Sequence, residues 1–131
     1  MITQITYYEQ KLAYEMDPAD LFAALDQGST EYVVVDTRQA YAYDEERIPG
    51  AIHFRHLDMN EETTAELGRS KTYVCYCAGI GCNGSTKGSL NLTRLGFKVK
   101  ELIGGLEWWK KDGFATEGTG AAEGALISCA C

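Results

Sequence analysis

Three cysteines lie close together in the middle of the chain, at Cys75, Cys77 and Cys82, and only Cys77 stands between an apolar run and a glycine-rich segment. Backbone N–H groups of such a segment, together with the positive end of a following helix, stabilise a thiolate and lower its pKa from a free value of about 8.5. A thiolate held in this way could attack an electrophilic sulfur or phosphorus atom, while the N–H groups hold the oxyanion. The alternative is that Cys77 is a small apolar core residue. We predict that Cys77 is the catalytic nucleophile, and that the anion-binding loop comprises Ala78, Gly79, Ile80, Gly81, Cys82, Asn83, Gly84 and Ser85.

The two neighbouring cysteines have different expected roles. Cys75 shares the alternation of Cys77 but lies two residues deeper in the apolar run, so we expect it to pack in the core. Cys82 is either a second thiol that resolves a persulfide or disulfide on Cys77, or a loop residue whose side chain points away. The spacing leaves both readings open, because it does not fix the distance that a disulfide requires.

Two further cysteines end the sequence, at Cys129 and Cys131. They could exchange with Cys77 or Cys82, or belong to a dispensable tail whose exposed thiols oxidise readily. The spacing of Cys75 and Cys77 on a strand is not that of a zinc-binding pair. We therefore expect no metal and no other cofactor.

Strands and helices that alternate along the chain must position this loop. Runs rich in β-branched and aromatic residues predict strands at 14–16, 32–35, 51–54, 72–77 and 98–103. Apolar spacing, caps and glycine stops predict helices at 2–12, from Asp17-Pro18 to about Gly28, at 39–46, 61–67 and 84–95, and from Gly104-Gly105 to Lys110-Lys111. This order predicts an α/β fold with a mostly parallel central sheet of about five strands and helices on both faces. Ligands of such sheets bind at the carboxyl ends of the strands, where Cys77 is expected.

Composition restricts the partners. The chain has 131 residues, a net charge of −7 and a pI of about 4.8, which argues against nucleic acid or an anionic membrane as a partner. The N-terminus lacks the pattern of a signal peptide, and no apolar run approaches the length of a membrane span. We therefore expect a cytoplasmic protein with reduced cysteines. The oligomeric state is not indicated.

Five short motifs in a fixed order resemble a single domain of the rhodanese family. They are Val33-Val34-Val35-Asp36-Thr37-Arg38, Ile48-Pro49-Gly50-Ala51-Ile52, Tyr76-Cys77 with its glycine loop, Leu95-Gly96-Phe97, and Leu102-Ile103-Gly104-Gly105 with Trp108. The resemblance implies a rhodanese-like domain at 17–114, preceded by an extension with a short helix at 1–16 and followed by a flexible Gly/Ala-rich tail at 115–131. It also implies a sulfurtransferase, in which Cys77 takes a sulfane sulfur from a donor such as thiosulfate and passes it from a persulfide to a thiol or other thiophilic acceptor.

The loop departs from the pattern of that family, which is Cys-x-x-Gly-x-Arg-Ser. Ser85 aligns with the family serine, so Gly84 occupies the arginine position and Cys77 lies two residues farther upstream than usual. Without the arginine, a dianion such as thiosulfate should bind weakly, unless Lys87 or Arg38 substitutes. We therefore expect weak activity with thiosulfate, or a different donor.

We expect mainly structural roles for four other polar residues. Asp36 and Arg38 resemble the Asp-x-Arg of the family, and we expect an ion pair that pins neighbouring loops, with a role in the site as the alternative. His53 and His56 are not convincing bases, and we expect them to be surface or hydrogen-bonded residues.

Two alternatives to a sulfurtransferase follow from the same residues. A cysteine phosphatase or arsenate reductase needs an arginine six residues after the cysteine, where this chain has Asn83. A non-enzymatic rhodanese-like module could instead bind a partner or sense redox state through Cys77 and Cys82. Formation of a persulfide or of an internal disulfide would distinguish these functions.

Overall fold

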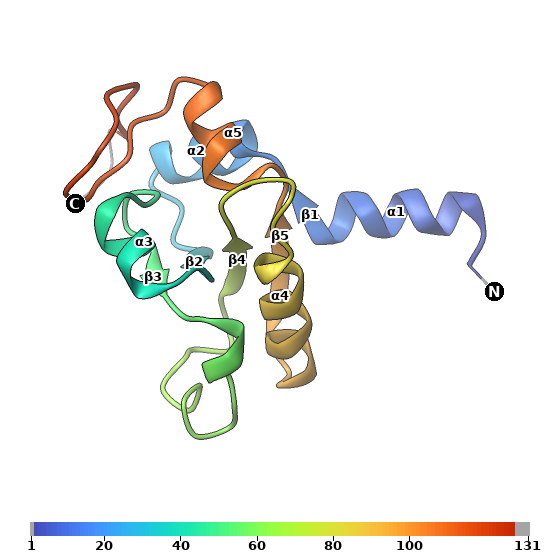
Figure 1. Cartoon of the computed structure of the whole chain (residues 1–131). Helices are drawn as coiled ribbons and strands as arrows, with labels where there is room; N and C mark the ends of the chain where they lie inside the picture. Colours follow the sequence, from blue (N-terminus) through green and yellow to red (C-terminus); the bar gives the residue numbers. More distant parts are fainter. Residues whose placement is uncertain (1, 128–131) are drawn as a thin grey trace.

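A five-stranded parallel sheet forms the centre of the protein, and the structure, a computed structural model, describes residues 2–127 (Figure 1). The strand order is β1-β5-β4-β2-β3, and every pairing is parallel. In chain order the elements are α1 (Gln4–Tyr14), β1 (Glu15–Met16), α2 (Pro18–Asp26), β2 (Tyr32–Asp36), α3 (Ala40–Glu45), β3 (Ile52–His53), the 3-10 turn η1 (His56–Asp58), β4 (Thr72–Tyr76), α4 (Gly84–Arg94), β5 (Lys98–Leu102) and α5 (Gly105–Lys111). The predicted α/β class and parallel sheet are confirmed.

Alternation along the two central strands builds a hydrophobic core on each face of the sheet. Val34 of β2 and Val74 of β4 pack into a cluster with Trp109 of α5. Val35 points to the opposite face and packs in a cluster with Leu92 of α4. Successive side chains of a strand alternate between faces, so a continuous apolar run needs a cover on both sides. Helices therefore lie on both faces, as predicted.

The second helix shows why several boundaries could be predicted. Asp17 caps α2, because its Oδ1 accepts a hydrogen bond of 2.8 Å from the backbone N–H of Asp20. Pro18 occupies the first turn, where its missing N–H costs nothing. Gly28 follows the helix with a φ of 78°, the left-handed conformation that favours glycine.

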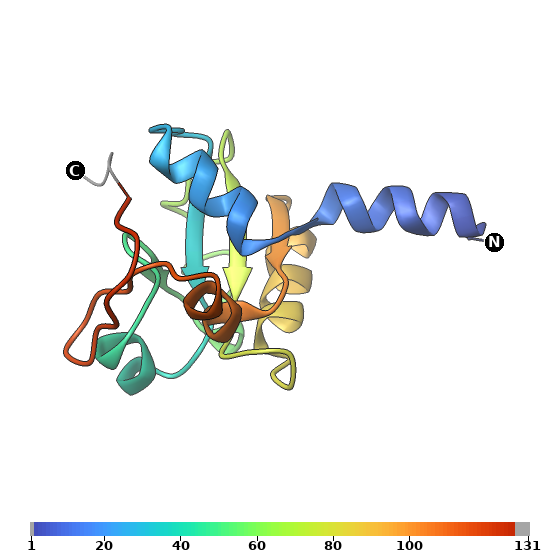
Figure 2. The ribbon, with the colours of Figure 1, turned by 90° about the horizontal axis from the view of Figure 1, so that it is seen from above.

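Helix α1 extends away from the rest of the molecule (Figures 1 and 2). The helix was predicted from the spacing of Ile5, Tyr8 and Leu12, but none of its residues is buried. Leu12 is 81% exposed. The apolar stripe is therefore not a face of the core of this chain.

The prediction of a helix at 61–67 is wrong. This segment forms a series of turns, and only η1 before it is helical. Asn60 and Thr63 hydrogen-bond reciprocally through side chain and backbone at 2.9 Å, and the Thr64 hydroxyl donates to the Asn60 carbonyl at 2.7 Å. Such local bonds from asparagine and threonine compete with helical hydrogen bonds.

The segment after α5 differs from the expected loose tail. Ala115 and Thr116 are buried, and Glu117 exchanges backbone hydrogen bonds with Arg47 at 2.9 and 3.0 Å. This part of the chain runs back past α3 (Figure 1). Glycine-rich composition lowers the propensity for regular structure, but it does not prevent packing by hydrogen bonds to a neighbouring loop. The predictions for Cys129 and Cys131 concern residues outside those that the structure describes.

No helix within residues 2–127 is long and apolar enough to cross a membrane.

Candidate active site

Cys77 lies directly after β4, at the carboxyl edge of the sheet. The neighbouring strand β2 ends at Asp36, and Thr37 follows it. Thr37 ties the two strand ends together, because its backbone N–H and its hydroxyl both donate to the carbonyl of Tyr76, at 3.1 and 2.8 Å. This places Cys77 at a junction between two central strands, as expected for the site of an open α/β sheet.

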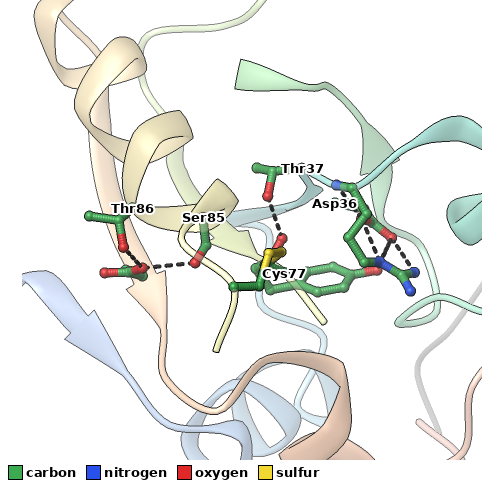
Figure 3. Close-up of a disulfide and its surroundings, with 9 residues drawn as sticks. Asp36, Thr37, Cys77, Ser85 and Thr86 are labelled. Carbon is green, nitrogen blue, oxygen red and sulfur yellow. Dashed lines mark hydrogen bonds and ion pairs between the residues drawn. A yellow bond between two sulfur atoms is a disulfide. The ribbon is translucent and has the colours of Figure 1, made fainter. Parts of the chain in front are cut away.

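Cys77 forms a disulfide with Cys82 (Figure 3). Their Cα atoms are 6.1 Å apart, within the range of ordinary disulfides. Cys82 is half-buried and its side chain points toward Cys77, so the alternative that it points away is excluded. The structure is therefore the oxidised form, in which the sulfur of Cys77 is not free to act as a nucleophile.

Backbone contacts with α5 fix the start of the loop. The N–H of Leu106 donates to the carbonyl of Cys77 at 3.0 Å, and that of Glu107 donates to Ala78 at 2.9 Å. A Cβ atom on Gly105 would lie 2.3 Å from the carbonyl oxygen of Cys77, so only glycine permits this approach. The last predicted helix therefore has a direct role in holding the cysteine.

The loop contributes fewer residues to the site than predicted. Cys77, Ala78, Cys82, Asn83 and Gly84 line a cleft of about 530 Å³. The remaining members of the predicted anion-binding loop, Gly79, Ile80, Gly81 and Ser85, are not among the residues that line this cleft. Ile80 is instead 80% exposed, beside Trp108.

Gly84 lies against the two sulfur atoms of the disulfide. A Cβ atom at this position would lie 3.4 Å from the Sγ of Cys77, 3.6 Å from that of Cys82 and 3.3 Å from the Oγ1 of Thr37. A side chain at position 84 would therefore begin in van der Waals contact with both sulfur atoms, and only the Thr37 hydroxyl would be a tight neighbour. The N–H groups of Gly84 and Ser85 belong to the first turn of α4, where a helix has no internal acceptors for them.

The side chain of Ser85 is hydrogen-bonded away from the cleft, and Lys87 does not line it. The hydroxyls of Ser85 and Thr86 both donate to Oε2 of Glu101, at 2.8 and 2.6 Å, on the side of α4 that faces β5 (Figure 3). Lys87 is exposed, and it is not among the residues that line the cleft. Neither residue contacts the cysteine pair.

Asp36 and Arg38 form the expected structural ion pair. The carboxylate of Asp36 is fully buried and accepts from the guanidinium of Arg38 at 2.7 to 3.2 Å, and from the hydroxyl of Tyr76 at 2.8 Å. Arg38 also donates to the carbonyls of Ala42 and Glu46. Burial alone would lower the pKa of Arg38, but its hydrogen bonds with Asp36 raise it above its ordinary value. This guanidinium is thereby committed to holding α3 against β2.

Cys75 is a buried core residue, as predicted. Its side chain has no exposed surface, and burial raises the pKa of its thiol to about 12. Such a thiol stays protonated near neutral pH and is a poor nucleophile.

Two basic residues of the cleft were not assigned to the site from the sequence. Arg55 and His56 follow β3 and line the wall that faces the loop. They line the same cleft as Cys77 because β3 pairs with β2 at the edge of the sheet. In the sequence, the one feature that could have indicated their role is that two basic residues follow a predicted strand. Because they lie far from Cys77 along the chain, nothing in the sequence linked them to the cysteine. No cluster of three or more potential metal ligands occurs within residues 2–127.

The comparisons agree with this fold. The chain matches the model of the rhodanese-like domain over residues 17–112. It is 34% identical over 82 residues to thiosulfate sulfurtransferase GlpE of Coxiella burnetii, an alignment that covers 61% of this chain and 73% of that protein. The crystal structure of the BH2092 protein of Bacillus halodurans superposes with a TM-score of 0.87 at 44% identity, covering 92% of this chain and 88% of the other. A protein of Lactobacillus plantarum gives a TM-score of 0.71 at 32% identity, covering 83% and 92%.

The fold and the site define an α/β protein with a cysteine at the carboxyl end of a central parallel strand, followed by a loop that leads into a helix. The match spans well over half of the chain. The protein therefore belongs to the rhodanese-like domain family.

Proposed function

We propose that this protein is a sulfurtransferase that carries sulfane sulfur as a persulfide on Cys77. The position of Cys77, at the strand end and before the free N–H groups of α4, is the observation that supports this most directly. The similarity to thiosulfate sulfurtransferase GlpE supports the same class of reaction. The donor is thiosulfate or another sulfane or persulfide compound, and the acceptor is a thiol or other thiophile. We place the reaction in the cytoplasm, with neither nucleic acid nor membrane as a partner.

The reaction begins with reduction of the Cys77–Cys82 disulfide by a thiol reductant, which yields two thiols. The thiolate of Cys77 attacks the sulfane sulfur of thiosulfate, the S–S bond of the donor breaks, and sulfite leaves with the electron pair. The thiolate of an acceptor then attacks the outer sulfur of the persulfide and releases Cys77 as a thiolate. No net oxidation occurs over these two transfers.

Cys82 provides a second way to discharge the persulfide. Its thiolate attacks the inner sulfur, on Cys77, and hydrosulfide leaves as the Cys77–Cys82 disulfide forms. The disulfide in the structure supports this step, since it shows that the two sulfur atoms reach bonding distance. Cys82 is then the resolving thiol.

The same disulfide favours a second candidate function, a rhodanese-like module that binds a partner or senses redox state without sulfur turnover. In that function Cys77 and Cys82 would cycle between thiol and disulfide only. The two functions differ in whether Cys77 ever carries an additional sulfur atom.

Intact-protein mass distinguishes them. The protein is reduced, freed of reductant and incubated with thiosulfate or with a persulfide donor, as wild type, Cys77→Ser and Cys82→Ser. We expect Cys82→Ser to gain one sulfur atom that a reductant removes, Cys77→Ser to gain none, and the wild type to release sulfide and form the disulfide. Gain only with the persulfide donor would indicate that the missing loop arginine limits the use of thiosulfate. No gain with either donor would favour the redox-sensing module, and sulfide release with disulfide formation in Cys82→Ser would exclude Cys82 as the resolving thiol.

A further inference from the structure

The cleft beside Cys77 is lined by basic side chains, although the whole chain is acidic. The protein has 19 acidic and 12 basic residues and a net charge of −7. Yet no carboxylate occurs among the described residues that line this cleft, whereas Arg38, Arg55 and His56 do. A cleft lined by one sign of charge concentrates ligands of the opposite sign. Its wall therefore favours an anionic ligand.

Arg55 is the arginine of this cleft that keeps hydrogen-bond donors available for a ligand. Arg38 is largely buried and spends its guanidinium on Asp36 and on two backbone carbonyls. The side chain of Arg55 is 38% exposed, and its Nε and Nη2 donate to Asp58 at 3.0 and 3.4 Å. A guanidinium carries five N–H donors, so the edge that bears Nη1 remains for a ligand.

The loop itself leaves this role open. Gly84 stands where the family has its loop arginine, so no side chain of the loop supplies a cation beside the two sulfur atoms. Lys87 lies outside the residues that line the cleft. Arg38 and Arg55, the arginines that line the cleft, are therefore the candidate cations for a small dianionic donor in front of Cys77.

We propose that Arg55 is a specificity-determining residue that binds the anionic oxygen-bearing group of the sulfur donor, a sulfonate or a carboxylate, in the cleft in front of Cys77. This rests on the proposed function and names its substrate class: anionic donors are preferred to neutral ones. With thiosulfate, the group held by Arg55 is the one that leaves as sulfite, so the guanidinium also stabilises the charge that develops as the S–S bond breaks. Asp58 competes with the donor for the same guanidinium.

A matched pair of alkylating agents tests the anion site without reference to sulfur transfer. Iodoacetate and iodoacetamide have nearly the same shape, but only iodoacetate is an anion. The rates at which each modifies Cys77 are measured on the reduced full chain, by mass mapping, for the wild type, Arg55→Gln, Asp58→Asn and Arg94→Gln. Arg94 is an exposed arginine in the last turn of α4, so its replacement changes the net charge by the same amount outside the cleft.

We expect the ratio of the iodoacetate rate to the iodoacetamide rate to fall about fivefold in Arg55→Gln, as for loss of one partly exposed charge-assisted hydrogen bond. The ratio should rise in Asp58→Asn and change little in Arg94→Gln. An equal fall of this rate ratio in Arg55→Gln and Arg94→Gln would overturn the proposal, because the loss of one positive charge anywhere on the protein would then explain it.

Persulfide loading of the same proteins, each also carrying Cys82→Ser so that the persulfide accumulates, identifies the anionic group. A larger loss with thiosulfate than with glutathione persulfide in Arg55→Gln would indicate the sulfonate, and the reverse would indicate a carboxylate. Loading that is equal in wild type and Arg55→Gln with both donors would refute the donor role while leaving Cys77 as the persulfide carrier. A changed alkylation ratio without any loading would instead retain the anion site and refute the sulfurtransferase.

Discussion

Two cysteines that lie two residues apart in the chain are both buried, but only Cys77 borders the cleft. Cys75 is enclosed by the core, where burial raises the pKa of its thiol to about 12. Cys77 lies at the cleft, and once its disulfide with Cys82 is reduced its sulfur faces the first turn of α4. Cys77 thus borders the cleft because it lies one strand repeat closer to the sheet edge than Cys75.

This contrast predicts selective alkylation. In the reduced native protein at pH 8, iodoacetamide should modify Cys77 and Cys82 but modify Cys75 about a thousandfold more slowly, because a pKa near 12 leaves so little thiolate. Peptide mass mapping over time measures the three rates. In denaturant all three should react alike, which serves as the control. Modification of Cys75 at the rate of Cys77 in the native state would contradict the assignment.

At this scale the sequence predicts the nucleophile but only part of its surroundings. The strand, glycine loop and helix around Cys77 are local features, so their pattern is readable from the residues. The partner of Ser85, Glu101, and the approach of Arg55 to the cleft both depend on strand order, which brings together segments far apart in the chain. For the same reason the orientation of Cys82 stayed open until its loop was placed.

Elements were predictable where tertiary packing and local pattern agree. The strands β2 and β4 are continuous apolar runs that the sheet buries on both faces, and α2 has its cap, its proline and its terminal glycine in sequence. The prediction of a helix at 61–67 failed because reciprocal hydrogen bonds between Asn60 and Thr63 hold this segment in turns. The hydrogen bonds of the segment after α5 could not be predicted, because its glycine and alanine residues show no periodicity.

The contact between α5 and the active-site loop gives a prediction at the level of elements. Gly105 and Gly113 both have positive φ angles, 60° and 86°, but only at Gly105 would a Cβ meet the backbone of Cys77 and Gly79, at 2.3 and 3.0 Å. Gly113→Ala should therefore lower the free energy of unfolding by about 1 to 2 kcal/mol, the cost of the left-handed conformation alone. Gly105→Ala should lower it by more than about 3 kcal/mol, since α5 or the loop must also move.

Urea unfolding of the oxidised protein measures both values, with Gly113→Ala as the control for backbone conformation. Equal losses for the two variants would show that the close approach of α5 to Cys77 contributes nothing to stability.

At the level of the whole molecule, Glu46 connects three segments that are distant in sequence. It follows α3, accepts a hydrogen bond from Lys110 of α5 at 2.9 Å, and accepts another from the buried Thr116 at 2.8 Å. Burial alone would raise the pKa of Glu46, but these hydrogen bonds lower it below its ordinary value. The carboxylate thereby fastens the segment after α5 to the domain.

The lowered pKa of Glu46 makes stability depend on pH in a defined direction. Above the pKa of the unfolded carboxyl, about 4.3, both states are ionised and the contribution is fully present. As the pH falls below that value the unfolded state takes up the proton first, so the contribution is lost as the pH passes through the lower, folded pKa. The wild type should lose more stability than Glu46→Gln between about pH 5.5 and pH 3, by less than about 1 kcal/mol after allowance for solvent screening. Urea unfolding across this range measures the difference, with Glu61→Gln, an exposed carboxylate of the turn segment, as the control. Parallel pH profiles for the wild type and Glu46→Gln would mean that the bonds of Glu46 to Lys110 and Thr116 do not hold the segment after α5 in place.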